Sequence, residues 1–142
     1  MPVAAVDFYR GAALSLIIGH PAYERIQPMG QGRFLVNGGI RVWLRHSKER
    51  SPWHFSLTPE EVATLSEDLQ SGGSIFLGLV CRRDSICCLN AAEIGQALDL
   101  SDAGEQTLSV TRVPGRKLKV SGPGGKLEGV ILAAAFPDKV FS

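Results

Sequence analysis

The side chains best suited to chemistry are two cations and an aromatic ring that alternate along one short stretch. Arg41, Trp43 and Arg45 stand at every second position of Ile40–His46, and this spacing places them on one face of a strand. An indole between two guanidiniums can stack on a base while the cations hold phosphates. Alternatively, the indole packs under a helix and the arginines extend their charged ends to water. Three following residues join this candidate site for nucleic acid or another anion: His46, Lys48 and Arg50.

A second group of cations occurs in the last third of the chain, with no acid between its first and last members. Its members are Arg112, Arg116, Lys117, Lys119 and Lys126. Together with the first group, these cations could form one basic surface. The acidic residues would then lie elsewhere, in the segments Glu60–Asp68 and Glu93–Glu105. This separation of charge fits binding to a polyanion. The alternative is that an exposed hairpin carries lysines because charge blocks edge-to-edge strand pairing.

The residues that support catalysis are few. Metal-dependent hydrolysis on a sheet requires carboxylates on neighbouring strands. No Asp or Glu occurs in the expected strands, which are Arg33–Asn37, Ile40–His46, Trp53–Leu57 and Ile75–Cys81. The three histidines are His20, His46 and His54, and no nucleophile-elbow motif is present. We therefore expect a binding domain rather than an enzyme, without a metal or other cofactor.

The three cysteines, Cys81, Cys87 and Cys88, all fall in apolar sequence. This placement is typical of reduced, buried thiols in a cytosolic protein. A zinc site is disfavoured because there is no C-x₂-C pair and no histidine nearby.

Length and composition predict one globular domain over residues 1–142. Apolar residues make up 44% and charged residues 20%, and the net charge of +1 gives no overall attraction to nucleic acid or membrane. The apolar run Ala12–Ile18 is too short for a signal peptide and follows Asp7 and Arg10. No apolar segment approaches the roughly 20 residues of a membrane span, so we expect a cytoplasmic protein without membrane contact.

The pattern of apolar and turn residues predicts an α+β (mixed α/β) fold with a largely antiparallel sheet of hairpins. Two capped helices are expected, one begun by Thr58-Pro59-Glu60-Glu61 and a shorter one begun by Asn90 with Glu93. Asn37-Gly38 signals a tight hairpin turn. The expected helices are Val3–Ile18, the one ending near Gln70 and the short one after Asn90. The expected single strands are Tyr23–Pro28, Arg33–Asn37, Ile40–His46 and Trp53–Leu57. Two further pairs are expected to form hairpins: a central one of Ile75–Cys81 with Ile86–Leu89, and a second one of Thr107–Val113 with Lys117–Ser121. The segment Leu127–Ala133 is expected to be a last strand or a short helix.

This order of elements resembles the PD-(D/E)xK, restriction-endonuclease-like nuclease fold over about Val3–Leu100. The likeness is carried by Arg10-Gly11-Ala12-Ala13 in the first helix, by Ile40–Arg45 and by the W-x-F strand that follows. Members place a metal-binding Asp on one strand and an acid-x-Lys on the next. This chain offers Asn37 for the first, and Arg41-Val42-Trp43 or Trp43-Leu44-Arg45 for the second. The resemblance therefore implies a non-catalytic relative whose metal site has been lost.

Three functions follow as hypotheses. The first is binding of DNA, RNA or another anionic partner. The second is a protein-interaction or assembly subunit, with a protein partner or a second copy of the chain, and with an exposed Trp43 or Trp53 as its hot spot. The third is a metal-dependent nuclease or other hydrolase that uses the loop acids Asp7, Glu24 or Glu49.

Overall fold

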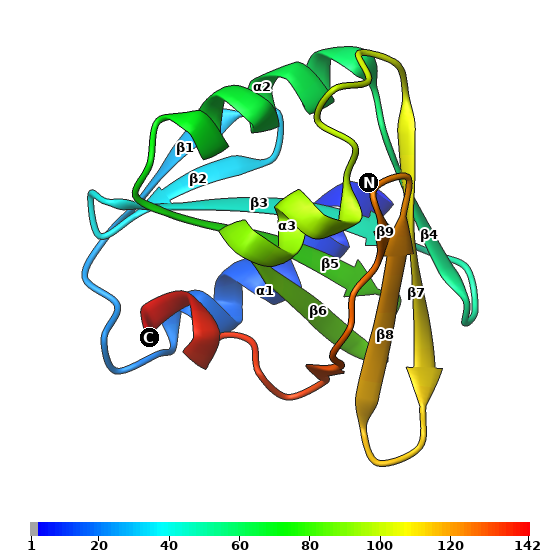
Figure 1. Cartoon of the computed structure of the whole chain (residues 1–142). Coiled ribbons are helices and arrows are strands. Elements are labelled where there is room, and N and C mark those ends of the chain that lie inside the picture. Colours follow the sequence, from blue (N-terminus) through cyan, green and yellow to red (C-terminus); the bar gives the residue numbers. More distant parts are fainter. Residues whose placement is uncertain (1–2) are drawn as a thin grey trace.

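The computed structural model describes residues 3–142 and contains two sheets that pack against each other (Figure 1). The first, sheet A, has the strand order β1-β2-β3-β5-β6. Its strands are β1 Ile26–Gly30, β2 Arg33–Val36, β3 Ile40–Ser47, β5 Ser74–Cys81 and β6 Ser85–Asn90. The second, sheet B, has the order β10-β8-β7-β4, with β9 paired to β8. Its strands are β4 Trp53–Leu57, β7 Gln106–Val113, β8 Lys117–Gly122, β9 Gly125–Lys126 and β10 Ile131–Leu132.

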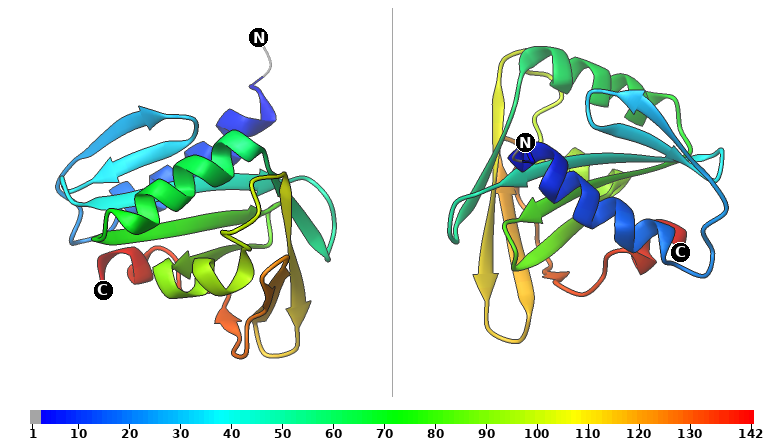
Figure 2. Two further views of the ribbon diagram at one scale, coloured as in Figure 1. Left: turned by 45° about the horizontal axis from the view of Figure 1, so that its top comes forward. Right: turned by 180° about the vertical axis from the view of Figure 1, so that it is seen from behind.

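Helices cover both faces of sheet A (Figure 2). They are α1 Ala5–Ile18, α2 Pro59–Gln70, α3 Ala91–Ala97 and the 3₁₀ helix η1 Asp138–Phe141. On one face, Val42 and Leu44 of β3 pack with Ala13 and Ile17 of α1 in a core cluster that also includes Val140. The opposite face of sheet A forms a larger core with α2, α3 and the inner face of sheet B. The alternation predicted for Ile40–His46 is therefore confirmed, since Val42 and Trp43 belong to different cores.

Local sequence explains where the two capped helices begin. The hydroxyl of Thr58 accepts from the backbone N–H of Glu61 at 3.2 Å, and the Glu61 carboxylate accepts from the N–H of Thr58 at 2.9 Å. Asn90 and Glu93 form the same reciprocal pair at the start of α3. Both predicted capping boxes are confirmed, and each satisfies N–H groups that a helix start leaves without partners.

The Asn37-Gly38 turn between β2 and β3 is also confirmed. Both residues have positive φ, 52° and 74°, as the central residues of a type I′ turn require, and the backbone N–H of Gly39 donates to the carbonyl of Val36 at 3.2 Å. Because Val36 pairs with Ile40, Gly39 is the third residue of this loop. The Asn37 side-chain oxygen accepts from the backbone N–H groups of Glu24, at 2.7 Å, and Arg25, at 3.2 Å. These bonds fix the chain that enters β1.

The α+β class is confirmed, but the strands divide differently from the expectation. The strand β5 pairs antiparallel with β6, as predicted, and parallel with β3, so β5 is internal and β6 ends the sheet. The second hairpin belongs to a separate sheet with β4 rather than to one common sheet. In Leu127–Ala133 only the two-residue strand β10 forms, and η1 was not expected. None of the helices within residues 3–142 has both the length and the hydropathy that crossing a membrane requires.

Candidate functional site

Trp43 lies in the core rather than on a binding surface. Its side chain is 0% exposed, and its Nε1 donates to Asp68 Oδ2 of α2 at 2.9 Å. The guanidiniums of Arg33 and Arg45 lie over the ring, 5.5 Å and 5.1 Å from its centroid. Base stacking on Trp43 is therefore ruled out in this structure, and the alternative interpretation of an indole packed under a helix holds.

The cations predicted beside Trp43 are not brought into one surface. Arg41 donates to the Ser71 hydroxyl at 2.7 Å, just after α2. Arg45 forms an ion pair with Glu61 and also donates to the carbonyl of Leu44 at 2.8 Å. His46 stacks on Tyr9 of α1, with 5.2 Å between ring centroids. Of these predicted site residues only Lys48 and Arg50, in the loop after β3, are exposed.

The Arg45–Glu61 pair connects β3 to the start of α2. Burial alone would raise the pKa of Glu61, but hydrogen bonds from Thr58 and the charge of Arg45 outweigh it and hold the pKa below its ordinary value of 4.5. The ionised carboxylate is thus the form that the folded state favours.

We expect the Glu61→Gln variant to be less stable than the wild type near neutral pH, with a difference that shrinks as the solution becomes acidic. A carboxylate whose folded pKa is depressed contributes stability above its unfolded pKa, and this contribution is lost as pH falls through the folded value. Urea unfolding of both proteins at pH 7 and in steps below pH 4.5 measures the difference. If the difference in the free energy of unfolding between the two proteins stays constant over this pH range, the pKa of Glu61 is not lowered by folding.

A cluster of arginines that the sequence did not reveal lies next to this pair. Arg10 of α1, Arg33 of β2 and Arg45 of β3 surround Gly32 and Trp43. Arg10 and Arg45 line a cleft of about 470 Å³ between α1, the β1–β2 turn, β3 and the start of α2. We call this hollow the arginine cleft; the residues that line it are Val6, Arg10, Gln31, Leu44, Arg45, His46, Thr58, Glu60 and Glu61.

The second predicted group of cations is largely exposed, on the outer face of sheet B. Leu118 and Val120 of β8 point into the core, so Lys117 and Lys119 point to solvent. Strand pairing places Thr111 beside Lys119, and places Ser121 between Ser109 and Lys126. We call this surface the basic face; it consists of Lys117, Lys119, Lys126, Ser109, Thr111 and Ser121.

The lysines of the basic face are without acidic partners in the part of the chain that the structure describes. None of the ion pairs within residues 3–142 includes Lys117, Lys119 or Lys126. Glu128 lines the same surface depression as Lys119 and Lys126. Arg116 is exposed in the turn of the hairpin. Arg112 differs from the rest of the predicted group, because it pairs with Asp84.

The residues proposed for the other two hypotheses are also placed. Trp43 and Trp53 are 0% and 4% exposed, so neither is a surface hot spot. The exposed apolar side chains of α1 are Val6, Phe8, Leu16 and Ile18. Among residues 3–142 no three His, Cys, Asp or Glu side chains form a group that could hold a metal ion, so Asp7, Glu24 and Glu49 do not meet in one.

The three cysteines are buried and unpaired, as predicted. Cys81, Cys87 and Cys88 are each 0% exposed and none forms a disulfide. Burial raises the pKa of the Cys81 and Cys88 thiols to about 12, and that of Cys87 well above its ordinary value.

Native protein at pH 8 should therefore react with iodoacetamide far more slowly than a free thiol. The thiolate is the reactive form, and the raised pKa leaves almost none of it at pH 8. Mass spectrometry of native protein should show no alkylation under conditions that modify all three residues in guanidinium chloride. Fast modification of any one cysteine in the native state would show that it is accessible.

The fold and these surfaces define the chain as an α+β domain with one exposed basic face and one arginine-lined cleft. Comparison of the chain with protein-family models, curated proteins and solved structures found no match in any of the three.

Proposed function

We propose that this protein is a non-catalytic domain that binds nucleic acid through the basic face. The observation that carries the proposal is a set of three exposed, unpaired lysines interleaved with hydroxyl side chains on neighbouring strands of sheet B. Lysine, serine and threonine are donors that commonly contact phosphate and sugar oxygens. Because no Phe, Trp or Tyr belongs to this face, the contacts should follow the backbone with little preference for base sequence.

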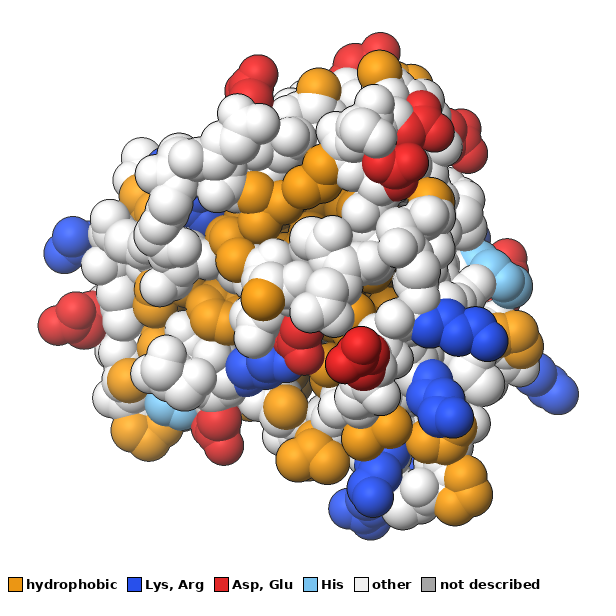
Figure 3. All heavy atoms as spheres, in the orientation of Figure 1, with side chains coloured by type: hydrophobic (Ala, Val, Ile, Leu, Met, Phe, Trp, Pro, Cys, Tyr) orange, Lys and Arg blue, Asp and Glu red, His pale blue; other side chains and the backbone are white. Residues whose placement is uncertain are grey.

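The distribution of charge supports this proposal. Figure 3 shows Lys and Arg gathered at the lower right, over the β7–β8 hairpin, while acidic side chains gather at the upper right, near α2 and the loop before β7. With a net charge of only +1, a uniform distribution would not attract a polyanion. Separation of the charges gives one end of the molecule a local positive potential that steers an anionic partner toward it.

Fluorescence anisotropy with labelled single- and double-stranded DNA and RNA, over a salt series, tests the proposal. Binding should weaken steeply as salt rises, because each phosphate contact releases condensed counterions. Absence of binding at low salt would reject the proposal. The likeness to PD-(D/E)xK nucleases remains a prediction and is not needed for this function.

A further inference from the structure

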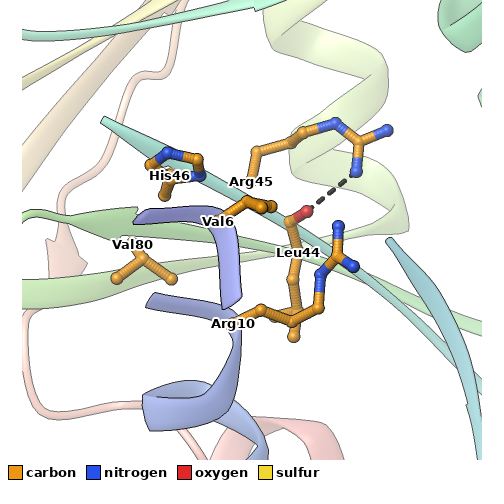
Figure 4. A pocket seen from close by; sticks show the side chains of 6 residues that line it. All are labelled: Val6, Arg10, Leu44, Arg45, His46 and Val80. Carbon is orange, nitrogen blue, oxygen red and sulfur yellow. Dashed lines mark hydrogen bonds between the residues drawn. The ribbon is translucent and has the colours of Figure 1, made fainter. Parts of the chain in front are cut away.

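We propose that the arginine cleft is a second, separate binding site, which takes the phosphate group of a small organic molecule. It lies between α1, β3 and the start of α2, whereas the basic face lies on the outer side of sheet B. Figure 4 shows Arg10 and Arg45 beside Leu44, with both side chains extending toward the same side. The inference does not depend on nucleic-acid binding.

The guanidiniums of Arg10 and Arg45 are brought together by their packing against Gly32. A Cβ atom built on Gly32 would lie 2.7 Å from Arg45 Nη1, 3.0 Å from Arg10 Nη2 and 3.0 Å from the carbonyl oxygen of Leu44. Only glycine leaves room for this packing, and its positive φ of 73° also favours glycine. Like charges held this close repel each other, and a bound anion would relieve that repulsion.

The charges around Arg10 leave it available for a ligand. The Glu61 carboxylate pairs with Arg45, and Asp68 pairs with Arg33 at 3.6 Å and accepts from Trp43. Within residues 3–142, Arg10 forms no ion pair or hydrogen bond, and its buried Nε has no partner. Its guanidinium lies over the Phe34 ring, 5.9 Å from the centroid. Arg45 already donates to the Leu44 carbonyl and to Glu61, so Arg10 supplies the free donors and Arg45 adds positive charge beside it. Free guanidinium donors suit a tetrahedral dianion, which accepts several charge-assisted hydrogen bonds.

The shape of the cleft indicates that the phosphate is attached to a larger molecule. The cleft is open to solvent, and its volume of about 470 Å³ exceeds what one phosphate ion requires. Val6 and Leu44 give the cleft apolar walls beside the two arginines. These walls would contact an apolar part of the ligand.

The remaining polar groups of the cleft affect an anion in opposite ways. Glu60 and Glu61 both line the cleft. The charge of Glu61 is neutralised by its ion pair with Arg45. Glu60 is exposed in the first turn of α2 and would repel an anion. Burial, together with the charges of Lys48 and Arg10, lowers the pKa of His46, so this ring is neutral at pH 7. An anion bound beside it would stabilise the protonated ring and raise that pKa.

Titration of the ¹⁵N-labelled full chain with inorganic phosphate tests the site. Saturable shifts should appear at Gly32, and the pKa of His46, followed by NMR of its ring, should rise when phosphate is present. Arg10→Gln should weaken phosphate binding by about tenfold or more, since a charge-assisted hydrogen bond is lost. Glu60→Gln should strengthen it, and Arg116→Gln, which removes a cation outside the cleft, should leave it unchanged.

The choice of Arg10 keeps the test interpretable. Arg10 has no acidic partner in the described chain, so the Arg10→Gln substitution leaves no buried carboxylate unpaired and should not unfold the protein. The titration of His46 uses the wild-type protein and therefore does not depend on any variant. No saturable shift at Gly32 with millimolar phosphate would overturn the proposal, as would equal binding by Arg10→Gln. Binding of acetate as tightly as phosphate would overturn the assignment to phosphate. Loss of phosphate binding in Arg10→Gln with unchanged DNA binding would separate this site from the basic face.

Discussion

Replacing Lys117, Lys119 and Lys126 together by glutamine should lower the affinity for duplex DNA by roughly tenfold to a hundredfold at low salt. The three side chains are exposed and unpaired, so each is free to contact a phosphate. The slope of log K against log salt should fall by about 0.9 for each contact that is lost. Fluorescence anisotropy at several salt concentrations gives both quantities.

A control with the same change in net charge separates local contacts from overall charge. Arg25, Lys48 and Arg50 are exposed cations outside the basic face, and their joint replacement by glutamine also removes three charges. This control should keep most of the affinity and nearly all of the salt slope. Equal losses in the two triple variants would show that only net charge matters. Both should unfold at nearly the same denaturant concentration as the wild type, because surface substitutions of this kind change stability little.

Trp43→Ala should destabilise the protein by about 3–5 kcal/mol, the largest stability effect that we expect of a single substitution. The change empties a fully buried site between sheet A and α2. It also removes the donor of the bond to Asp68 and the ring on which Arg33 and Arg45 pack. Guanidinium chloride unfolding followed by circular dichroism measures the loss.

The Trp43→Phe variant separates the loss of the hydrogen bond to Asp68 from the loss of apolar volume. Phenylalanine keeps much of the apolar volume but cannot donate to Asp68, so a cost of about 1–3 kcal/mol is expected. If Trp43 instead lay on an exposed binding surface, both substitutions would leave stability nearly unchanged and would weaken binding. That pattern would contradict the buried position of the indole.

Local signals in the sequence predicted much of the fold. Each capping box requires only residues three positions apart, and the Asn37-Gly38 turn only two adjacent residues; all three were confirmed. The burial of the cysteines followed from their apolar neighbours. These features were predictable because the interactions that define them lie within a few residues of chain.

Features that depend on distant segments could not be predicted in the same way. The alternation in β3 identified the Arg41, Trp43 and Arg45 face, but a period of two does not say whether a helix covers it. The structure places α2 over this face. Likewise, nothing near Arg10 in the sequence indicates that it meets Arg45, which is brought to it by the packing of α1 on β3.

The exposure of the lysines of the basic face was easier to predict, because it depends on neighbouring residues of one strand. Lys117 and Lys119 alternate with Leu118 and Val120 on one strand, so burial of the apolar pair exposes the cations. Arg112 departed from the group because Asp84, 28 positions earlier in the chain, lies beside it in the fold.

Mapping of amide shifts in the ¹⁵N-labelled protein as a short DNA duplex is added tests the central claim most directly, because it locates the contact without any substitution. The largest shifts should fall on Lys117–Gly122, Thr111 and Lys126, and should diminish as salt is added. Shifts centred on the arginine cleft or on α1, or no shifts at low salt, would contradict binding through the basic face.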